Sequence, residues 1–535
     1  MQYGFIIDNR KCIGCHACTT ACKSEHDVPV GVNRTYVKQV EKGEFPDTRR
    51  IFSVMRCNHC SDAPCAEICP VEALYTREDG IVDFDNNRCI GCKSCMQACP
   101  YDALYIDPET HTAAKCNYCA HRVEVGRAPA CVEVCPEHAI IAGDMDNTQT
   151  EISHLLSREQ VIVRKPEKGT NPNLFYINGD YQSLHPEATD KSGPGLWNSQ
   201  ARGVGHYAKA AEKMINTNDD VNLLQMSIDN NLQAAYQQKD TENPNYIDVL
   251  TGKARRVYDT PDKGILWGWE VSAYVMTKAI AAGAFLIPFL AILLGYDVSD
   301  TTKLWSVGIS LIFLALTGLF LVMDLDRPER FLNVLLRPQW NSWLVKGGYT
   351  ITIFGLLDTI WGVMTLLDAH TGEMFLLWIT AFFAVMLAVY TALLFAQAKG
   401  RDFWQSPTLP LHMLVHSVMA GVAVFILIPL DAYWMRILLP ILSGALLFNL
   451  LTMVTELTIT HPTTAAKTVV KMITKGQYKK LFWIGVVLVG NVLPLIIITM
   501  VPSKMTLSLG AILVLAGIYV TEKIWIEAPQ RIPLA

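Results

Sequence analysis

The sixteen cysteines of this chain constrain its fold most strongly, because all of them lie between Cys12 and Cys135 of 535 residues. They form four groups, and three of the groups end in Cys-Pro. Two groups have the spacing C-x2-C-x2-C-x3-C, and the others have C-x2-C-x4-C-x3-C and C-x2-C-x11-C-x3-C. The groups are Cys12, Cys15, Cys18 and Cys22; Cys57, Cys60, Cys65 and Cys69; Cys89, Cys92, Cys95 and Cys99; and Cys116, Cys119, Cys131 and Cys135. Such spacing is typical of 4Fe–4S ligation, in which three close thiolates bind one cube and the fourth reaches another.

Other uses of cysteine fit this pattern less well. Eight disulfides would be typical of a small secreted domain, and the N-terminus has no basic region, apolar core or twin arginine of an export signal. Zinc sites rarely need a third cysteine in C-x2-C-x2-C. Residues 12–16 also match the haem-attachment pattern C-x-x-C-H, but both cysteines belong to the longer group. The sequence therefore predicts iron–sulfur clusters in a reducing compartment.

The N-terminal part, residues 1–177, is predicted to be an α+β iron–sulfur domain. Residues 81–84 are expected to form a short strand before the third cysteine group, and this order indicates duplicated ferredoxin-like units. Residues 151–163 are expected to form a helix. Residues 178–262 are rich in Asn, Gln, Asp and Gly and are predicted to be a linker over the membrane or a partner, with one amphipathic helix near 221–236.

The C-terminal part, residues 263–535, is predicted to be an all-α polytopic membrane domain of eight transmembrane helices in two four-helix bundles. Each apolar run is long enough to cross a bilayer of roughly 30 Å. The net charge of −5 gives no sign of nucleic-acid binding. The predicted spans are residues 267–294, 304–323, 345–367, 374–398, 411–430, 434–455, 481–500 and 505–526.

The loops between the spans predict the orientation. An even number of spans returns the C-terminus to the side of the iron–sulfur domain, and the other side has only Lys303, Arg436 and Lys504 as basic loop residues. The positive-inside rule therefore places the iron–sulfur domain on the cytoplasmic side of the inner membrane. The basic loop residues on that side are Arg327, Arg330, Arg337, Lys399, Arg401, Lys467, Lys471, Lys475, Lys479 and Lys480.

Polar residues inside the spans are costly and therefore mark candidate functional positions. Lys278 lies about a dozen residues into the first span, where reaching the interface is difficult, whereas residues nearer helix ends can extend to it. A b-type haem is not expected, because its histidines usually come from facing helices. Asp358 and Asn491 lie deeper than the other candidates. The candidates for quinone and proton chemistry are Glu270, Tyr274, Lys278, Asp324, Lys346, His412 and His416.

Two stretches of the chain resemble known families. The four cysteine groups are similar to those of the four-cluster electron-transfer subunits of molybdopterin oxidoreductases, of the polysulfide and dimethyl sulfoxide reductase type. The C-terminal part resembles the NrfD/polysulfide-reductase membrane subunit, an eight-helix quinone-binding anchor. The matching residues are Tyr258-Asp259, Trp267-Gly268-Trp269, Tyr274 and the run DLDRPERF at 324–331. The family usually has these parts as separate chains, so this chain looks like a fusion of the two.

The resemblance also implies which cysteines share a cluster. Cys135 would complete the set of the first group, and Cys22 the set of the fourth. Cys99 would complete the set of the second group, and Cys69 that of the third. Sequence spacing alone does not show this pairing.

The sequence therefore predicts the electron-transfer and quinone-binding membrane subunit of a respiratory oxidoreductase complex. Electrons would pass between a catalytic subunit of molybdopterin type on another chain and menaquinone or ubiquinone, through four 4Fe–4S clusters. Tyr274 and Lys278 are expected to face the quinone pocket in the first four helices, and His412 is a further candidate for quinone binding. Two alternatives remain: a redox-driven proton-translocating module, and a passive anchor of a hydrogenase or formate dehydrogenase.

Overall fold

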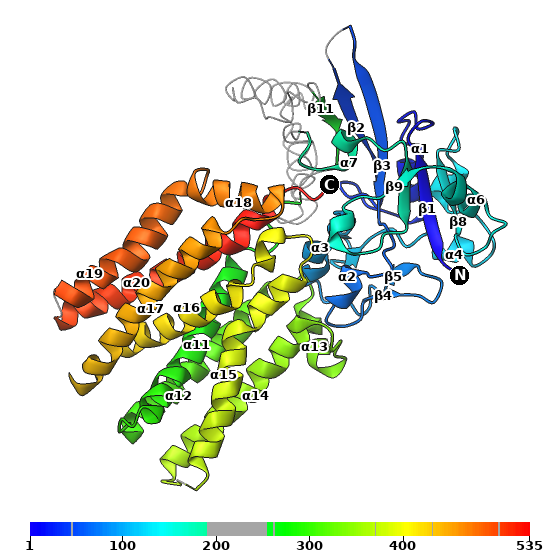
Figure 1. Ribbon diagram of the computed structural model, residues 1–535. Helices are drawn as coiled ribbons and strands as arrows, with labels where there is room; N and C mark the ends of the chain where they lie inside the picture. The colour runs from blue at the N-terminus through cyan, green and yellow to red at the C-terminus, as the bar shows by residue number, and fades with distance from the viewer. Residues whose placement is uncertain (44–45, 190–253, 261–262, 370, 431, 501–502) are drawn as a thin grey trace, which may run out of the picture. The chain divides into compact units, whose positions relative to one another are not determined.

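The computed structural model (Figure 1) describes residues 1–43, 46–189, 254–260, 263–369, 371–430, 432–500 and 503–535. Within them the chain divides into two units: Met1–Leu266 with Pro533–Ala535, and Trp267–Ile532. The first unit carries the sixteen cysteines, and the second carries the long apolar helices. The amphipathic helix expected near residues 221–236 lies outside the described residues.

The first unit contains a four-stranded sheet with the strand order β8-β1-β10-β9. β1 (Tyr3–Asp8) runs parallel to β10 (Leu174–Ile177) and antiparallel to β8 (Ile140–Asp144). β9 (Val161–Ile162) pairs antiparallel with β10. Alternate apolar residues of β1 belong to two different buried clusters, so this central strand is covered on both faces and forms part of the core.

A second sheet has the order β11-β2-β3 and is antiparallel throughout. It consists of β2 (Thr35–Lys42), β3 (Arg49–Arg56) and β11 (Ala254–Tyr258), so the end of the segment expected to be a linker forms an edge strand. Two small hairpins complete the strands, and β5 confirms the strand expected at 81–84. Their strands are β4 (Leu74–Thr76), β5 (Val82–Phe84), β6 (Tyr105–Ile106) and β7 (Ala113–Ala114).

Short helices follow the cysteine loops and confirm the α+β class. The longer α6 starts where expected, after the N-cap Thr150, but ends at Arg158 rather than at 163, because the chain then extends into β9. The C-terminal residues pack with this unit, and the Lys165 ammonium donates to the carbonyl oxygen of Leu534 at 2.9 Å. The helices are α1 (Ala17–Glu25), α2 (Pro64–Glu67), α3 (Ser94–Ala98), α4 (Ala120–Val123), α5 (Ala130–Glu133), α6 (Glu151–Arg158), η1 (Pro166–Lys168) and α7 (Tyr181–Leu184).

Where the structure describes it, the second unit is helical, and the eight long apolar spans found there confirm the number expected from the sequence. Short connections carry η4 (Pro328–Arg330), α13 (Asn333–Leu336), η5 (Asp402–Gln405) and α18 (Thr464–Thr474). The seventh span begins as a π-helix and continues as an α-helix. The spans are α11 (Trp269–Leu293), α12 (Asp300–Met323), α14 (Trp343–Leu366), α15 (Glu373–Gln397), α16 (Leu409–Leu427), α17 (Ala432–Thr458), η6 (Leu481–Val492) with α19 (Leu493–Met500), and α20 (Lys504–Gln530).

The spans fall into two groups of four, as expected. In the first group α11 packs on α12 and α15, and α14 packs between the same two helices. In the second group α16 packs on α17 and α20, and η6 with α19 packs on α20. The groups meet where α11 packs along α16, whose labels lie side by side in Figure 1. A Cβ atom on Gly283 would collide with the backbone of Ser417 and Gly421, so this contact requires glycine.

Candidate functional site

Two hollows in the first unit are each lined by four cysteines. One, of about 330 Å³, is lined by apolar side chains and by Cys12, Cys15, Cys18 and Cys135. The other, of about 310 Å³, is lined by apolar side chains and by Cys57, Cys60, Cys65 and Cys99. Each hollow takes three cysteines from one group and one from another, which is the ligand exchange that the family resemblance implies.

The first and third cysteine groups have the same loop conformation. Gly14 and Gly91 have φ values of 70° and 71°, and His16 and Lys93, two residues later, both have a φ of 60°. Left-handed residues turn the chain sharply within a few positions, which lets a short loop surround a compact ligand. α1 and α3 begin directly after these loops and lead to the fourth cysteine of each group. The shared geometry supports a duplicated unit.

The remaining eight cysteines also gather across groups. Cys22 interacts electrostatically with Cys116, Cys119 and Cys131. Cys95 interacts in the same way with Cys92, Cys89 and Cys69. All sixteen cysteines lie in the described residues and are free thiols. No three His, Cys, Asp or Glu side chains of the described residues converge on a single-ion position.

The surroundings of the thiols determine how they can ionise. Burial raises the pKa of the Cys18 thiol to about 11, so the thiolate that binds iron must be stabilised by the iron and by nearby donors. Backbone N–H groups supply part of this stabilisation. Ala73 donates to the sulfur of Cys69 and Ala139 to the sulfur of Cys135, both at 3.2 Å.

Two buried cations stand among the cysteines. Arg56 donates from Nη1 to Cys131 Sγ at 3.1 Å, while its Nε and Nη2 have no hydrogen-bond partner among the described residues. Lys115 donates to the carbonyl oxygens of Val82 and Cys116. A buried cation with unused donors is costly by itself, and an anionic cluster with sulfur acceptors would satisfy it. The residues present therefore fit 4Fe–4S clusters.

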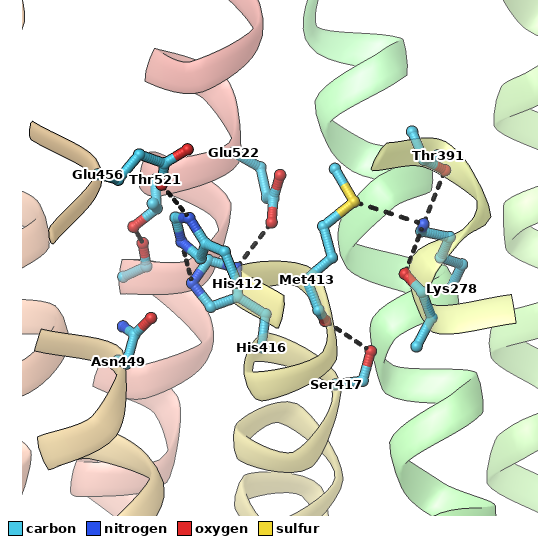
Figure 2. Close-up of polar contacts among 12 residues, drawn as sticks. Lys278, Thr391, His412, Met413, His416, Ser417, Asn449, Glu456, Thr521 and Glu522 are labelled. Carbon is cyan, nitrogen blue, oxygen red and sulfur yellow. Dashed lines mark hydrogen bonds and ion pairs between the residues drawn. The ribbon is translucent and has the colours of Figure 1, made fainter. Parts of the chain in front are cut away.

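In the second unit, the ammonium group of Lys278 on α11 is buried and bonded to α15 (Figure 2). It donates to the carbonyl oxygen of Ala388 at 3.0 Å and to Thr391 Oγ1 at 2.7 Å. It also lies 4.6 Å from the centre of the Tyr390 ring. Tyr274, one helical turn earlier, is buried as well, and its side chain interacts with Thr391. The structure thus brings Tyr274 and Lys278 to one polar site.

A second polar cluster lies within the other helix group. His412 and His416 stand one turn apart on α16, and their Nε2 atoms are 3.0 Å apart. His412 Nδ1 is 2.9 Å from Glu456 Oε2 of α17, and His416 Nδ1 is 2.7 Å from Glu522 Oε1 of α20. Figure 2 shows the two rings between the two carboxylates. All four residues are at most 5% exposed.

The other sequence candidates lie nearer the helix ends, and Asp324 interacts electrostatically with Tyr274. Glu270 is half-buried in the first turn of α11, and the Lys346 ammonium lies 4.5 Å over the ring of Trp343. Asp324 is half-buried at the end of α12. The hydrogen bonds of Lys278 go to α15, because α15 packs directly on α11.

Sequence reasoning missed Glu522 and Thr391. Glu522 lies near the end of the last span, beside Lys523 and Glu527, so the local pattern indicates only a polar helix end. Thr391 is an uncharged hydroxyl in an apolar helix and gives almost no sequence signal. Of the deeper candidates, Asp358 is buried on α14 with no hydrogen-bond partner among the described residues.

The fold and these sites define a membrane-bound iron–sulfur protein that joins a 4Fe–4S domain to an eight-helix membrane domain. The chain belongs to the polysulphide reductase NrfD family, which matches residues 260–527. Residues 48–145 match a 4Fe-4S dicluster domain, and residues 10–31 match a 4Fe-4S binding domain. These matches confirm both resemblances inferred from the sequence, and the sixteen cysteines are the ligands of the clusters.

Curated relatives match the iron–sulfur part. A tetrathionate reductase subunit of Salmonella typhimurium is 44% identical over 200 residues, which is 37% of this chain and 80% of that protein. A polysulfide reductase component of Wolinella succinogenes is 41% identical over 179 residues, 33% of this chain and 94% of that protein. Protein NrfC of Escherichia coli is 40% identical over 184 residues, 34% of this chain and 82% of that protein.

Proposed function

We propose that this chain is the electron-transfer and quinone-binding membrane subunit of a respiratory oxidoreductase complex. Electrons would pass between a catalytic subunit of molybdopterin type on another chain and the quinone pool. The observation that carries the proposal is that cysteine sets for clusters and a buried Lys–Thr–Tyr site occur in one chain of the NrfD family. The relatives named as reductase components support a separate catalytic partner.

The number of clusters follows from the ligands. Sixteen cysteines divide into four sets of four, so we propose four 4Fe–4S clusters. A bound cluster supplies one-electron transfer. The residues of this chain would hold it and would place N–H donors and the Arg56 guanidinium beside its sulfur ligands.

The Lys278 site is suited to a quinone oxygen. An ammonium group has three N–H donors, and two of those on Lys278 bond to Ala388 and Thr391. Among the described residues, the other contacts of this ammonium group are the Met413 sulfur at 4.0 Å, which is a weak acceptor, and the Tyr390 ring, whose centre lies 4.6 Å away. A quinone carbonyl would therefore gain a strong donor here. Tyr274 adds a hydroxyl one turn away, and we assign these residues to quinone binding and protonation.

We further propose that the iron–sulfur unit lies on the cytoplasmic side. The support is the excess of Lys and Arg in the loops on the same side as that unit. The chain leaves the first unit at Leu266, and α11 begins at Trp269. Lys278 then lies roughly 13 Å along α11, at about 1.5 Å per residue, so we propose that the quinone site lies in the half of the membrane where α11 begins.

The test is the variant Lys278→Met in the purified complex. Loss of the ammonium donor should slow quinol-coupled turnover at least tenfold, while dithionite still reduces the clusters and the catalytic partner still works with artificial dyes. The matched control is Lys303→Met, which removes a lysine that pairs with Glu373 at the opposite end of the spans. The control should leave quinol turnover unchanged.

Two results would count against the proposal. Normal quinol kinetics in Lys278→Met would refute the assignment of the quinone site. A complex in which no variant and no quinone analogue alters electron transfer would instead favour the passive anchor. A redox-driven proton pump needs a continuous polar path across the membrane, and the deeper groups Asp358 and Asn491 lie in different helix groups.

A further inference from the structure

The cluster of two histidines and two glutamates in the second helix group forms one continuous hydrogen-bonded chain. It runs from Glu456 through His412 and His416 to Glu522, with distances of 2.9, 3.0 and 2.7 Å. Three helices contribute to it, and the partners at its two ends lie 44 and 106 positions apart in the sequence. Both ring nitrogens of His412 are engaged, so this histidine offers no free nitrogen to a quinone.

The hydrogen bonds determine how many protons the chain holds. Three bonds need three protons, and with two carboxylates and two imidazoles this leaves a net charge of −1. Several arrangements share this count, among them two in which one charged histidine lies between two carboxylates, and two others are the end states for proton transfer. In one end state, Glu456 is protonated and Glu522 is charged, and in the other the roles are reversed. They interconvert when each proton crosses its own hydrogen bond, without any gain or loss of protons.

The hydrogen-bonded chain also runs from positions near helix ends to positions deeper in the helix group, toward the Lys278 site. Glu456 lies two residues before α17 ends, and His412 lies three residues after α16 begins. His416, Glu522 and Lys278 lie roughly 10–14 Å from the ends of their helices, at about 1.5 Å per residue. In an alternating series of spans, the starts of α11 and α16 and the ends of α17 and α20 share one side. Along the hydrogen-bonded series, the members after His412 therefore lie deeper from the helix ends than Glu456 and His412.

The inner end of the chain faces the Lys278 site. Glu522 and Lys278 interact electrostatically, and Figure 2 shows Glu522 on the side of His416 nearest Met413 and Lys278. At the outer end, Glu456 Oε1 is buried and has no hydrogen-bond partner among the described residues. The Glu456 carboxylate therefore has a lone pair available for a proton. The Glu522 carboxylate interacts with the charge at the proposed quinone site.

We propose that Glu456, His412, His416 and Glu522 form a proton relay between the membrane surface and the quinone site. The proposal rests on the quinone site at Lys278. During quinone reduction, one proton binds at Glu456, the three protons shift along their hydrogen bonds, and one proton leaves Glu522 for the reduced quinone. The relay ends with the proton count it began with. Quinol oxidation runs the same steps in reverse, and the proton returns to the side from which it came.

A purely structural role is the alternative for this chain. Buried polar networks lock helices together when every member is satisfied, and this one connects α16 to α17 and α20. The two roles differ in what a conservative substitution does. Glutamine keeps the shape and most of the hydrogen bonding of glutamate but cannot carry the relayed proton. If the chain only holds the helices together, turnover should survive the glutamine substitution. If the chain relays protons, the substitution should slow turnover.

The test compares Glu522→Gln and Glu456→Gln with Glu527→Gln, which removes a carboxylate of α20 outside the chain. We expect each relay variant to slow quinone-linked turnover at least tenfold and to raise the solvent deuterium isotope effect, since proton transfer becomes limiting. The double variant should be no slower than the slower single variant. Both residues lie on one proton path, so a second block adds nothing to the first. Dithionite reduction of the clusters should be unchanged throughout, and Glu527→Gln should match wild type.

The outcomes separate the relay from the quinone site. Full turnover in Glu522→Gln, together with slow turnover in Lys278→Met, overturns the relay and leaves the quinone site standing. Full turnover in both variants overturns the quinone site itself. If Glu522→Gln fails to assemble, the test uses Glu456→Gln at the other end of the hydrogen-bonded chain. In that variant, slow turnover without an increased isotope effect supports the structural role and contradicts the relay.

Discussion

The buried guanidinium of Arg56 should raise the reduction potential of the clusters beside it. It donates to the sulfur of Cys131 at 3.1 Å and interacts electrostatically with Cys116 and Cys18. These cysteines belong to two different sets, so one cation acts on two cluster sites. Reduction adds a negative charge to a cluster, and a nearby positive charge favours that state. The variant Arg56→Gln should therefore lower the potentials of two clusters.

The geometry gives the size of the effect. If the guanidinium charge lies roughly 6 Å from the centre of the added electron, their interaction at an effective dielectric constant of about 20 is about 3 kcal/mol. A tenfold change in a one-electron equilibrium corresponds to about 59 mV and to about 1.4 kcal/mol. Loss of the charge should thus lower the potential of the nearer cluster by about 120 mV.

The assay is a redox titration of the purified protein followed by electron paramagnetic resonance. Arg56→Lys is the matched control, because it keeps the charge and loses the planar donor set, so its potentials should lie much closer to wild type. The reasoning fails if Arg56→Gln keeps all four clusters and every potential stays within about 20 mV of wild type, which is roughly a twofold change in the equilibrium.

Three further predictions concern composition, orientation and stability. Anaerobically purified protein should contain about sixteen iron and sixteen acid-labile sulfide per chain, and stoichiometric zinc would contradict the cluster assignment. A reporter joined after Ala535 by a flexible linker should give a cytoplasmic signal, and alkaline phosphatase activity would reverse the orientation. Burial lowers the pKa of Lys38 well below its ordinary value, with the Arg256 charge adding to the effect. The unfolded state then binds more protons, so wild-type stability rises with pH. Lys38→Met should raise the melting temperature at pH 7, and this advantage should shrink toward pH 9.

Features encoded over short stretches could be predicted from the sequence. A cysteine loop is determined by spacing and by a few residues that adopt a left-handed conformation, such as Gly14 and Gly91. A membrane span is determined by length and apolarity. Both kinds of signal are local, so the cluster domain, the eight spans and the two helix groups followed from the residues and from the family resemblance.

Features that depend on distant partners could not be predicted. Lys278 stood out because a charge in an apolar helix is expensive, but its partner Thr391 lies 113 residues away and carries no charge. Glu522 meets His416 across 106 residues. The edge strand β11 pairs with β2 only in the folded sheet, so its polar sequence looked like the rest of the linker. Tertiary packing, rather than local pattern, selects each of these contacts.

The glycine contact between α11 and α16 fixes how closely the two helix groups of the membrane unit approach each other. Gly283 lies five residues after Lys278, and Gly421 lies five residues after His416, so the crossing point sets the distance between the Lys278 site and the histidine chain. A misplacement of about 1 Å at a reacting group can cost about a hundredfold in rate. Replacement of either glycine by alanine should force the two helices apart, because the added Cβ would collide with the backbone of the facing helix. In the proposed relay, this separation should slow proton transfer although every side chain of the relay is still present.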